Sequence, residues 1–114
     1  MVLLVDARLP VIFTTPDPTG PETALLIQDN APAPAGHPVA RFTLPATAHP
    51  TGCACCLPRG PVAEALSYLF LARARGEISF FRQVLALPAN AAGTAAIHAA
   101  LTQDPVVSAR FRLG

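Results

Sequence analysis

Residues 61–87 have the sequence PVAEALSYLFLARARGEISFFRQVLAL, which predicts a helix followed by a buried strand. Pro61 is preorganised for the first turn of a helix, and Gly76 is a common residue just past a last turn, so we expect the helix over 61–75. The apolar side chains that recur at helical spacing and form its buried face are Val62, Leu66, Leu69 and Phe70. The predicted strand is the short apolar run 84–87.

Upstream of this unit the chain predicts two strands and one ambiguous segment. Residues 10–15 are apolar or β-branched and end at Pro16, as expected of a buried strand. Residues 39–44 alternate apolar and polar side chains, which also indicates a strand. Residues 22–29 suit a short helix or a strand equally well.

Downstream, Asn90 is a good N-cap for an alanine-rich helix that runs to about Leu101. Asp104 then caps a last helix, whose C-terminal end carries Arg110 and Arg112 with favourable charge. Strands that alternate with helices predict an α/β fold. We therefore expect a small, mostly parallel sheet with covering helices, in a single domain over residues 1–114.

The composition limits the function. Of the 114 residues, 52% are hydrophobic and 13% are charged, which is typical of a globular domain and not of a disordered chain. A net charge of +1 gives no electrostatic reason to expect nucleic acid or a membrane as a partner. All eight basic residues are arginines, so the lysine that a phosphate-binding loop requires is missing. So few charges favour self-association, and we expect a homodimer with a hydrophobic interface.

The N-terminus predicts no targeting segment, because its apolar run ends at Asp6 and Arg8 after a few residues. The chain has three cysteines, and they are crowded between residues 53 and 56. An odd, crowded set is not a disulfide framework and agrees with a reducing compartment. The predicted location is cytoplasmic.

The cysteines Cys53, Cys55 and Cys56 are the one constellation with evident chemistry. Thiolates are preferred ligands of zinc and similar metals, and residues 53 and 55 of an extended segment project to the same side. One further turn brings in residue 56, so three sulfur atoms can converge on one ion. Gly52 permits a tight approach of the backbone. We therefore predict a zinc or cobalt site here.

Other interpretations of the cluster stay open. A single cysteine is usually a small buried hydrophobic residue, but three within four residues are hard to explain as packing. His49 is a candidate fourth ligand, although a lone loop histidine is more often solvated. A redox role is weaker, since the adjacent Cys55 and Cys56 would form a strained disulfide, whereas Cys53 with Cys56 is geometrically open. His37 and His98 are interpreted as structural.

The segment Gly52-Cys53-Ala54-Cys55-Cys56, followed by an arginine and a helix, resembles the Gly-Cys-x-Cys-Cys motif of the CobW-type P-loop GTPases, a family of metallochaperones. Residues 104–113 are similar to that family's Asp-Pro segment, which ends in an arginine and an aromatic residue. Residues 9–26 match the frame of its first strand and phosphate loop. The resemblance implies a truncated P-loop architecture, corresponding to the family's N-terminal half, with metal bound at the cysteines.

The departures from the family fall on its nucleotide-binding residues. In this register the phosphate-loop glycines are replaced by Pro16, Thr19 and Pro21, and the lysine by Glu22. Prolines lack the backbone N–H groups that cradle phosphate, and glutamate repels it. Thr23 keeps the magnesium-side hydroxyl, while residues 87–90 replace the family's Glu-Thr-Thr-Gly. No bound nucleotide and no hydrolysis are expected.

Two functions remain. The first is a non-hydrolytic metal-binding protein that passes zinc or cobalt to a metal-acceptor protein, because three thiolates with an exposed fourth position suit transfer. The second is a structural or partner-binding module in which the cysteines only pin a loop. No pair of acid and base side chains at useful spacing supports an independent hydrolase.

Overall fold

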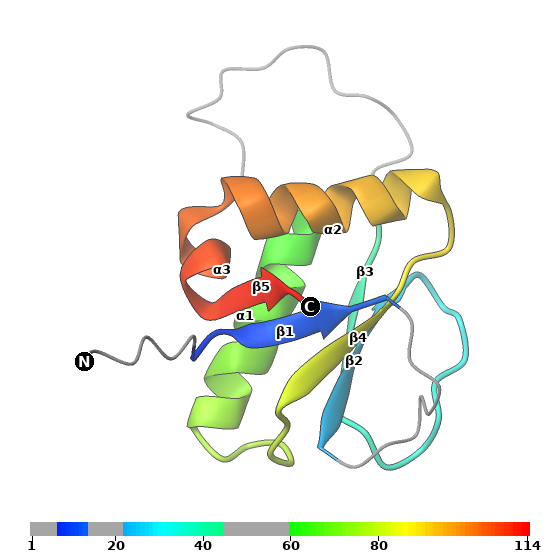
Figure 1. The fold of residues 1–114 in the computed structure, drawn as a ribbon. Coiled ribbons are helices and arrows are strands. Elements are labelled where there is room, and N and C mark those ends of the chain that lie inside the picture. Colours follow the sequence, from blue (N-terminus) through cyan, green and yellow to red (C-terminus); the bar gives the residue numbers. More distant parts are fainter. Residues whose placement is uncertain (1–6, 14–21, 45–59) are drawn as a thin grey trace, which may run out of the picture.

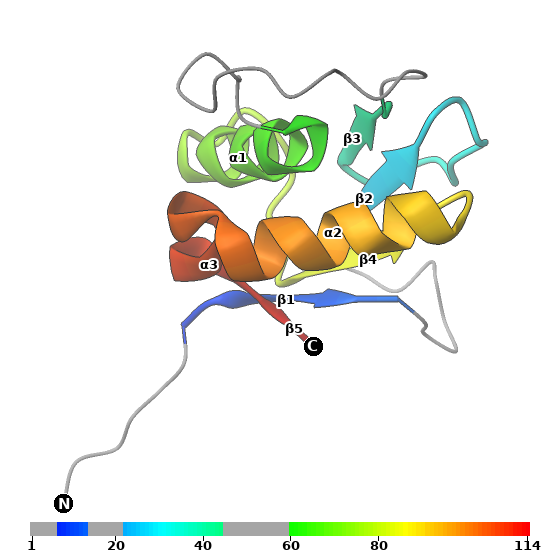
Figure 2. The same ribbon diagram turned by 90° about the horizontal axis from the view of Figure 1, so that it is seen from above.

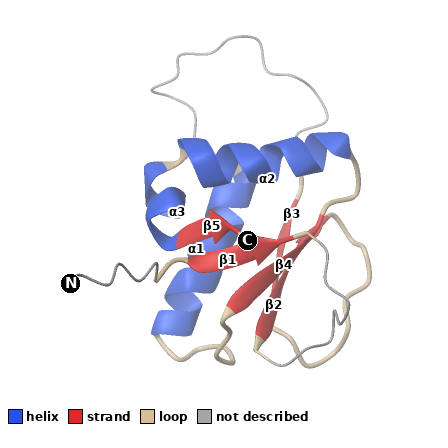
Figure 3. Cartoon of the chain, viewed as in Figure 1, coloured by secondary structure: helices blue, strands red, loops and turns tan. Residues whose placement is uncertain are grey.

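The computed structural model describes residues 7–13, 22–44 and 60–114 of the chain, and these form an α/β fold (Figures 1 and 3). The elements in chain order are β1 (Leu9–Ile12), β2 (Thr23–Gln28), β3 (Val39–Phe42), α1 (Pro61–Ala74), β4 (Gln83–Leu87), α2 (Ala91–Gln103), α3 (Pro105–Arg110) and β5 (Phe111–Leu113). The described helices include none that is long and apolar enough to cross a membrane.

The five described strands form one sheet in the order β3-β2-β4-β1-β5, and every neighbouring pair is parallel. The central strands are apolar on both faces, and all six residues of β2 are buried. Continuous burial is what parallel strands require, since connections cross both faces of the sheet. The expected α/β class with a parallel sheet is confirmed.

The strand order explains why the helices lie on one face. The connections from β3 to β4 through α1, and from β4 to β5 through α2 and α3, both advance across the sheet in the same direction. Crossovers of the same hand must then lie on the same face, as Figure 2 shows. The connection from β2 to β3 runs the other way, and its Ala33 packs on the opposite face, against the cluster that contains Leu25.

Burial follows the two faces. Alternate strand residues such as Val11, Leu26 and Val84 point into the larger cluster together with Leu66 of α1 and Ile97 of α2. The smaller cluster, on the other face, consists of Leu25, Ile27 and Leu85. At about 25 cal/mol per Å² of buried apolar surface, such a two-sided sheet is the main source of stability in a small domain.

Several elements match the sequence closely. The helix predicted over 61–75 is α1, and its residues Val62, Leu66 and Leu69 are buried as expected, whereas Phe70 is only partly buried against the same core. Asn90 caps α2 by accepting a hydrogen bond from Gly93 N, 2.8 Å away. Asp104 caps α3 through hydrogen bonds from the backbone of residues 106 and 107.

Other expectations are corrected. Arg112 was expected at the end of the last helix, but it lies in β5, because Phe111 is extended and its buried side chain fills the core beside β1. The ambiguous residues 22–29 contain a strand, β2. The strand predicted over 39–44 ends at Phe42. The strand predicted over 10–15 is β1, which begins at Leu9 and ends at Ile12 before a bend at Phe13, and residues 14 and 15 lie outside the described part.

Candidate functional site at the carboxyl edge of the sheet

The carboxyl edge of the sheet is the natural place for a site in this fold. Because all neighbouring strands are parallel, the segments that follow β1, β2, β3 and β4 all leave from the same edge. Open α/β sheets bind ligands outside these strand ends. The predicted metal-binding segment, residues 45–59, follows the carboxyl end of β3 and precedes α1.

At this edge Gln28 joins the end of β2 to the start of α2. Its side chain is 3% exposed, and its Oε1 accepts a hydrogen bond of 2.7 Å from Ala89 N. Its Nε2 donates to Asn90 Oδ1 at 3.4 Å, while the same oxygen caps α2. The amide therefore fixes the loop after β4, where the resembled family has its Glu-Thr-Thr-Gly. Within this loop, residues 88–90, no side chain is a carboxylate.

Gly93 lets α2 approach Gln28 this closely. A Cβ atom at position 93 would overlap Gln28 Oε1 and come within 2.7 Å of Gln28 Cδ. Sequence reasoning missed Gln28. The signal that could have identified it is a single polar residue closing the apolar run TALLIQ, because a buried amide at a strand end needs partners in a neighbouring loop.

Glu22 and Thr23, which occupy the lysine and hydroxyl positions of a phosphate loop in the resemblance, lie at the opposite edge. Thr23 begins β2, and its hydroxyl accepts a hydrogen bond of 3.0 Å from Gln83 Nε2 at the start of β4. Glu22 forms an ion pair of 2.7 Å with Arg82. A phosphate loop leads from the carboxyl end of a strand into a helix. Here Thr23 leads into a strand, at the amino edge of the sheet.

The predicted metal ligands Cys53, Cys55, Cys56 and His49 lie outside the described residues, as do Pro16, Thr19 and Pro21. Within residues 7–13, 22–44 and 60–114, no group of three or more His, Cys, Asp or Glu side chains is arranged to hold a metal ion. The described residues on either side of the cysteine segment are part of the folded domain. Leu44 packs against the larger core cluster, and Gly60 is the N-cap of α1.

The two remaining histidines have separate environments. The His98 ring, on α2, stacks on Phe13 just after β1, with ring centroids 5.0 Å apart and an interplanar angle of 9°. His37 precedes β3, and its Nδ1 lies 2.9 Å from Thr23 O. The two rings thus contact opposite ends of the parallel strands.

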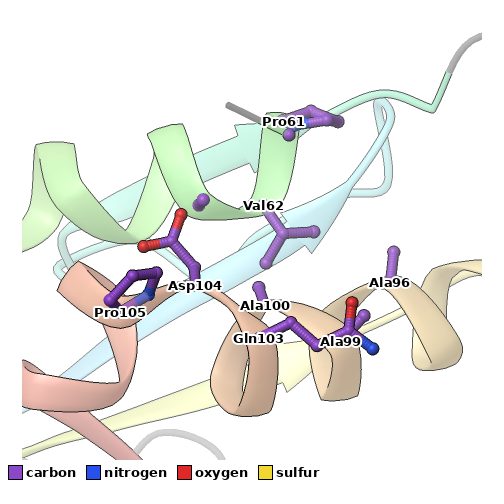
Figure 4. Close-up of a pocket in the computed structure, with 10 residues that line it drawn as sticks. Pro61, Val62, Ala96, Ala99, Ala100, Gln103, Asp104 and Pro105 are labelled. Carbon is purple, nitrogen blue, oxygen red and sulfur yellow. The ribbon is translucent and has the colours of Figure 1, made fainter. Parts of the chain in front are cut away.

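A hollow of about 410 Å³ opens beside the start of α1, directly after the cysteine segment (Figure 4). Its lining is mainly apolar and comes from Gly60 to Ala63, from the alanines of α2, and from Gln103, Asp104 and Pro105. One carboxylate oxygen of Asp104 accepts hydrogen bonds from Val106 N and Val107 N, so this side chain serves to start α3. A volume of this size is within the range of small-ligand pockets, but the lining offers few polar groups to orient a ligand.

Comparisons with known proteins identify no relative of this chain. No family model matches the sequence, no curated protein is significantly similar to it, and no solved structure matches it. The activity must therefore be inferred from the residues of this chain.

Proposed function

We propose that this protein binds zinc or cobalt through Cys53, Cys55 and Cys56 and does not hydrolyse nucleotides. The observation that carries the proposal is the sequence Gly-Cys-Ala-Cys-Cys at residues 52–56. Because the three thiolates lie in one short segment, little loop-closure entropy is lost when they bind a common ion. His49 is the nearest candidate for a fourth ligand, and a metal-acceptor protein or water can take that position during transfer.

The described fold supports this proposal by the placement of the segment. Residues 45–59 connect the carboxyl end of β3 with α1, and the carboxyl edge is where parallel α/β sheets place their binding loops. Both ends of the segment are anchored in the core, by Leu44 before it and by Val62 after it. A site on such a segment can exchange its metal while the sheet and helices keep their packing.

The absence of hydrolysis is supported by the amino-edge position of Glu22 and Thr23. Neither residue can approach phosphates bound outside the carboxyl ends of the strands. Gln28 and Asn90 bind each other and the backbone at the edge where magnesium ligands would be needed. Magnesium sites are usually built from carboxylates and phosphate oxygens.

The test is a cobalt titration of the metal-free, reduced protein. Thiolate ligation gives a sulfur-to-cobalt charge-transfer absorption that nitrogen and oxygen ligands do not give. We expect stoichiometric binding with release of protons, since thiols must deprotonate to bind. Cys55→Ser should abolish stoichiometric cobalt binding at the cysteines, measured by this absorption, and change the melting temperature little, whereas the matched control Thr43→Ser, at an exposed position before the segment, should absorb as the parent does.

Two outcomes would contradict the proposal in different ways. If the triple serine variant at 53, 55 and 56 binds cobalt as tightly as the parent, the ligands lie elsewhere. If it binds none and also fails to fold, the metal is structural.

A partner-binding module is the second candidate, and exposed apolar side chains favour it. Tyr68 and Leu71 on α1 are 52% and 40% exposed, and Phe80 before β4 is 54% exposed. Aromatic side chains are enriched in interfaces between proteins relative to the rest of the surface. The proposed partner is a second copy of this chain, and light scattering tests it: a dimer that Tyr68→Glu dissociates supports it, and a parent protein that stays monomeric at high micromolar concentration contradicts it.

A further inference from the structure

A second hollow lies at the amino edge of the sheet, away from the cysteine segment. Its volume is about 390 Å³, and two segments line it: the loop residues Gly36, His37 and Pro38 before β3, and the turn residues Glu77, Ile78 and Ser79 between α1 and β4. None of these residues belongs to the function proposed above.

His37 is oriented in the way that metal-binding histidines usually are. A carbonyl oxygen only accepts hydrogen bonds, so the contact of 2.9 Å between His37 Nδ1 and Thr23 O places the ring proton on Nδ1. The lone pair of the neutral ring is then on Nε2, which makes no hydrogen bond to the described residues. Histidines that bind metals typically donate their other ring N–H to a carbonyl or carboxylate, and this contact fixes the tautomer.

The other polar groups of the hollow favour a cation. Among the described residues, Glu77 is the only charged one that lines it, and Ser79 adds a hydroxyl oxygen. Glu77 N donates to Ala72 O at 2.9 Å, and the turn passes through Gly76 at a φ of 70°, so the end of α1 fixes the backbone of Glu77. No arginine in the described part of the chain lines the hollow to neutralise this carboxylate.

We propose that this hollow is a second cation site, which binds Zn²⁺ or Co²⁺ through His37 Nε2 and the Glu77 carboxylate, with water at the remaining positions. Imidazole nitrogen is a preferred ligand of these ions, and a carboxylate oxygen is accepted alongside it. Only two protein ligands are involved, so the site is weak and exchanges its metal rapidly. It is independent of the cysteines and does not rest on the function proposed for them.

The test uses the full-length chain with Cys53, Cys55 and Cys56 replaced by serine, titrated with zinc chloride. We expect one zinc ion per chain by calorimetry, together with a shift of the His37 Nε2 resonance in nitrogen-15 NMR. His37→Ala and Glu77→Gln should each weaken binding at least about tenfold, which corresponds to about 1.4 kcal/mol. The matched control His98→Ala removes a histidine on a different element and should leave the affinity unchanged.

The same experiment can overturn the proposal. Zinc binding that survives both His37→Ala and Glu77→Gln, or that His98→Ala weakens equally, would show that the hollow is not the site. If His37→Ala fails to fold, Glu77→Gln still tests the site. The Glu77 side chain makes no hydrogen bond within the described structure, so we expect this variant to fold. If the cysteine-free chain binds no zinc while the parent binds one ion, this inference fails and the cysteine site stands.

Discussion

Replacing Gly93 with alanine should destabilise the protein, although alanine is the better helix former. The new Cβ would overlap Gln28 Oε1, so the buried amide must rotate away from its partners. That movement breaks the 2.7 Å hydrogen bond from Ala89 N and the contact of Gln28 with Asn90. Because Gln28 is 3% exposed, water cannot readily replace these partners.

The two opposing effects can be estimated. Glycine to alanine inside a helix gains about 1 kcal/mol of helix propensity. Leaving the Gln28 amide and Ala89 N–H buried without partners costs about 1–3 kcal/mol each, or about 2–4 kcal/mol together after partial relaxation. The net loss is then about 1–3 kcal/mol, which lowers the melting temperature of a domain of this size by about 5–15 °C.

Urea denaturation of a double-mutant cycle provides the measurement. Gln28→Ala removes the amide that the new Cβ would meet, so Gly93→Ala in that background should stabilise by up to about 1 kcal/mol. The effect of Gly93→Ala on the free energy of unfolding should therefore differ between the parent and the Gln28→Ala background by more than about 1 kcal/mol. If Gly93→Ala stabilises the parent as much as it stabilises the Gln28→Ala variant, the explanation of this contact is wrong.

Three further predictions address a cap, the core and the nucleotide question. Asp104→Ala should lower the free energy of unfolding by about 0.5–2 kcal/mol in urea melts, because residues 106 and 107 lose their capping oxygen, and Asp104→Asn should lose less. Leu66→Ala should cost about 2–5 kcal/mol in the same melts, since Leu66 is fully buried between α1 and the sheet. Calorimetry with magnesium–GTP should detect no binding to the parent or to Glu22→Lys, and micromolar binding to either would contradict the position assigned to residue 22.

Much of the fold could be predicted because its signals are local. The Pro61 start and Gly76 end of α1, and the caps Asn90 and Asp104, act within one helical turn, so their effect does not depend on the rest of the molecule. The α/β class followed from the alternation of strands and helices. The cysteine cluster can also be seen from the sequence alone, because three cysteines lie within four residues, and its binding of a metal stays a prediction.

What could not be predicted depends on contacts distant in sequence. The segment TALLIQ is apolar enough for either a helix or a strand, and its pairing with β3 and β4 decides for the strand. The pairing of Phe111 with Leu9, far along the chain, ends α3 and draws Arg112 into β5. His37 and Glu77 are about 40 residues apart, and only the fold places both beside one hollow.

The topology explains why the phosphate-loop register cannot be repaired by one substitution. The chain leaves β1 at the carboxyl edge and enters β2 at the amino edge, because the two strands belong to one parallel sheet. Residue 22 immediately precedes β2, so any side chain placed there belongs to the amino edge. A lysine at this position would face Arg82, not a phosphate outside the strand ends. Nucleotide binding would require residues 23–28 to leave the centre of the sheet and form a helix. Leu26 would then be lost from the larger core cluster, and Leu25 and Ile27 would be lost from the smaller one.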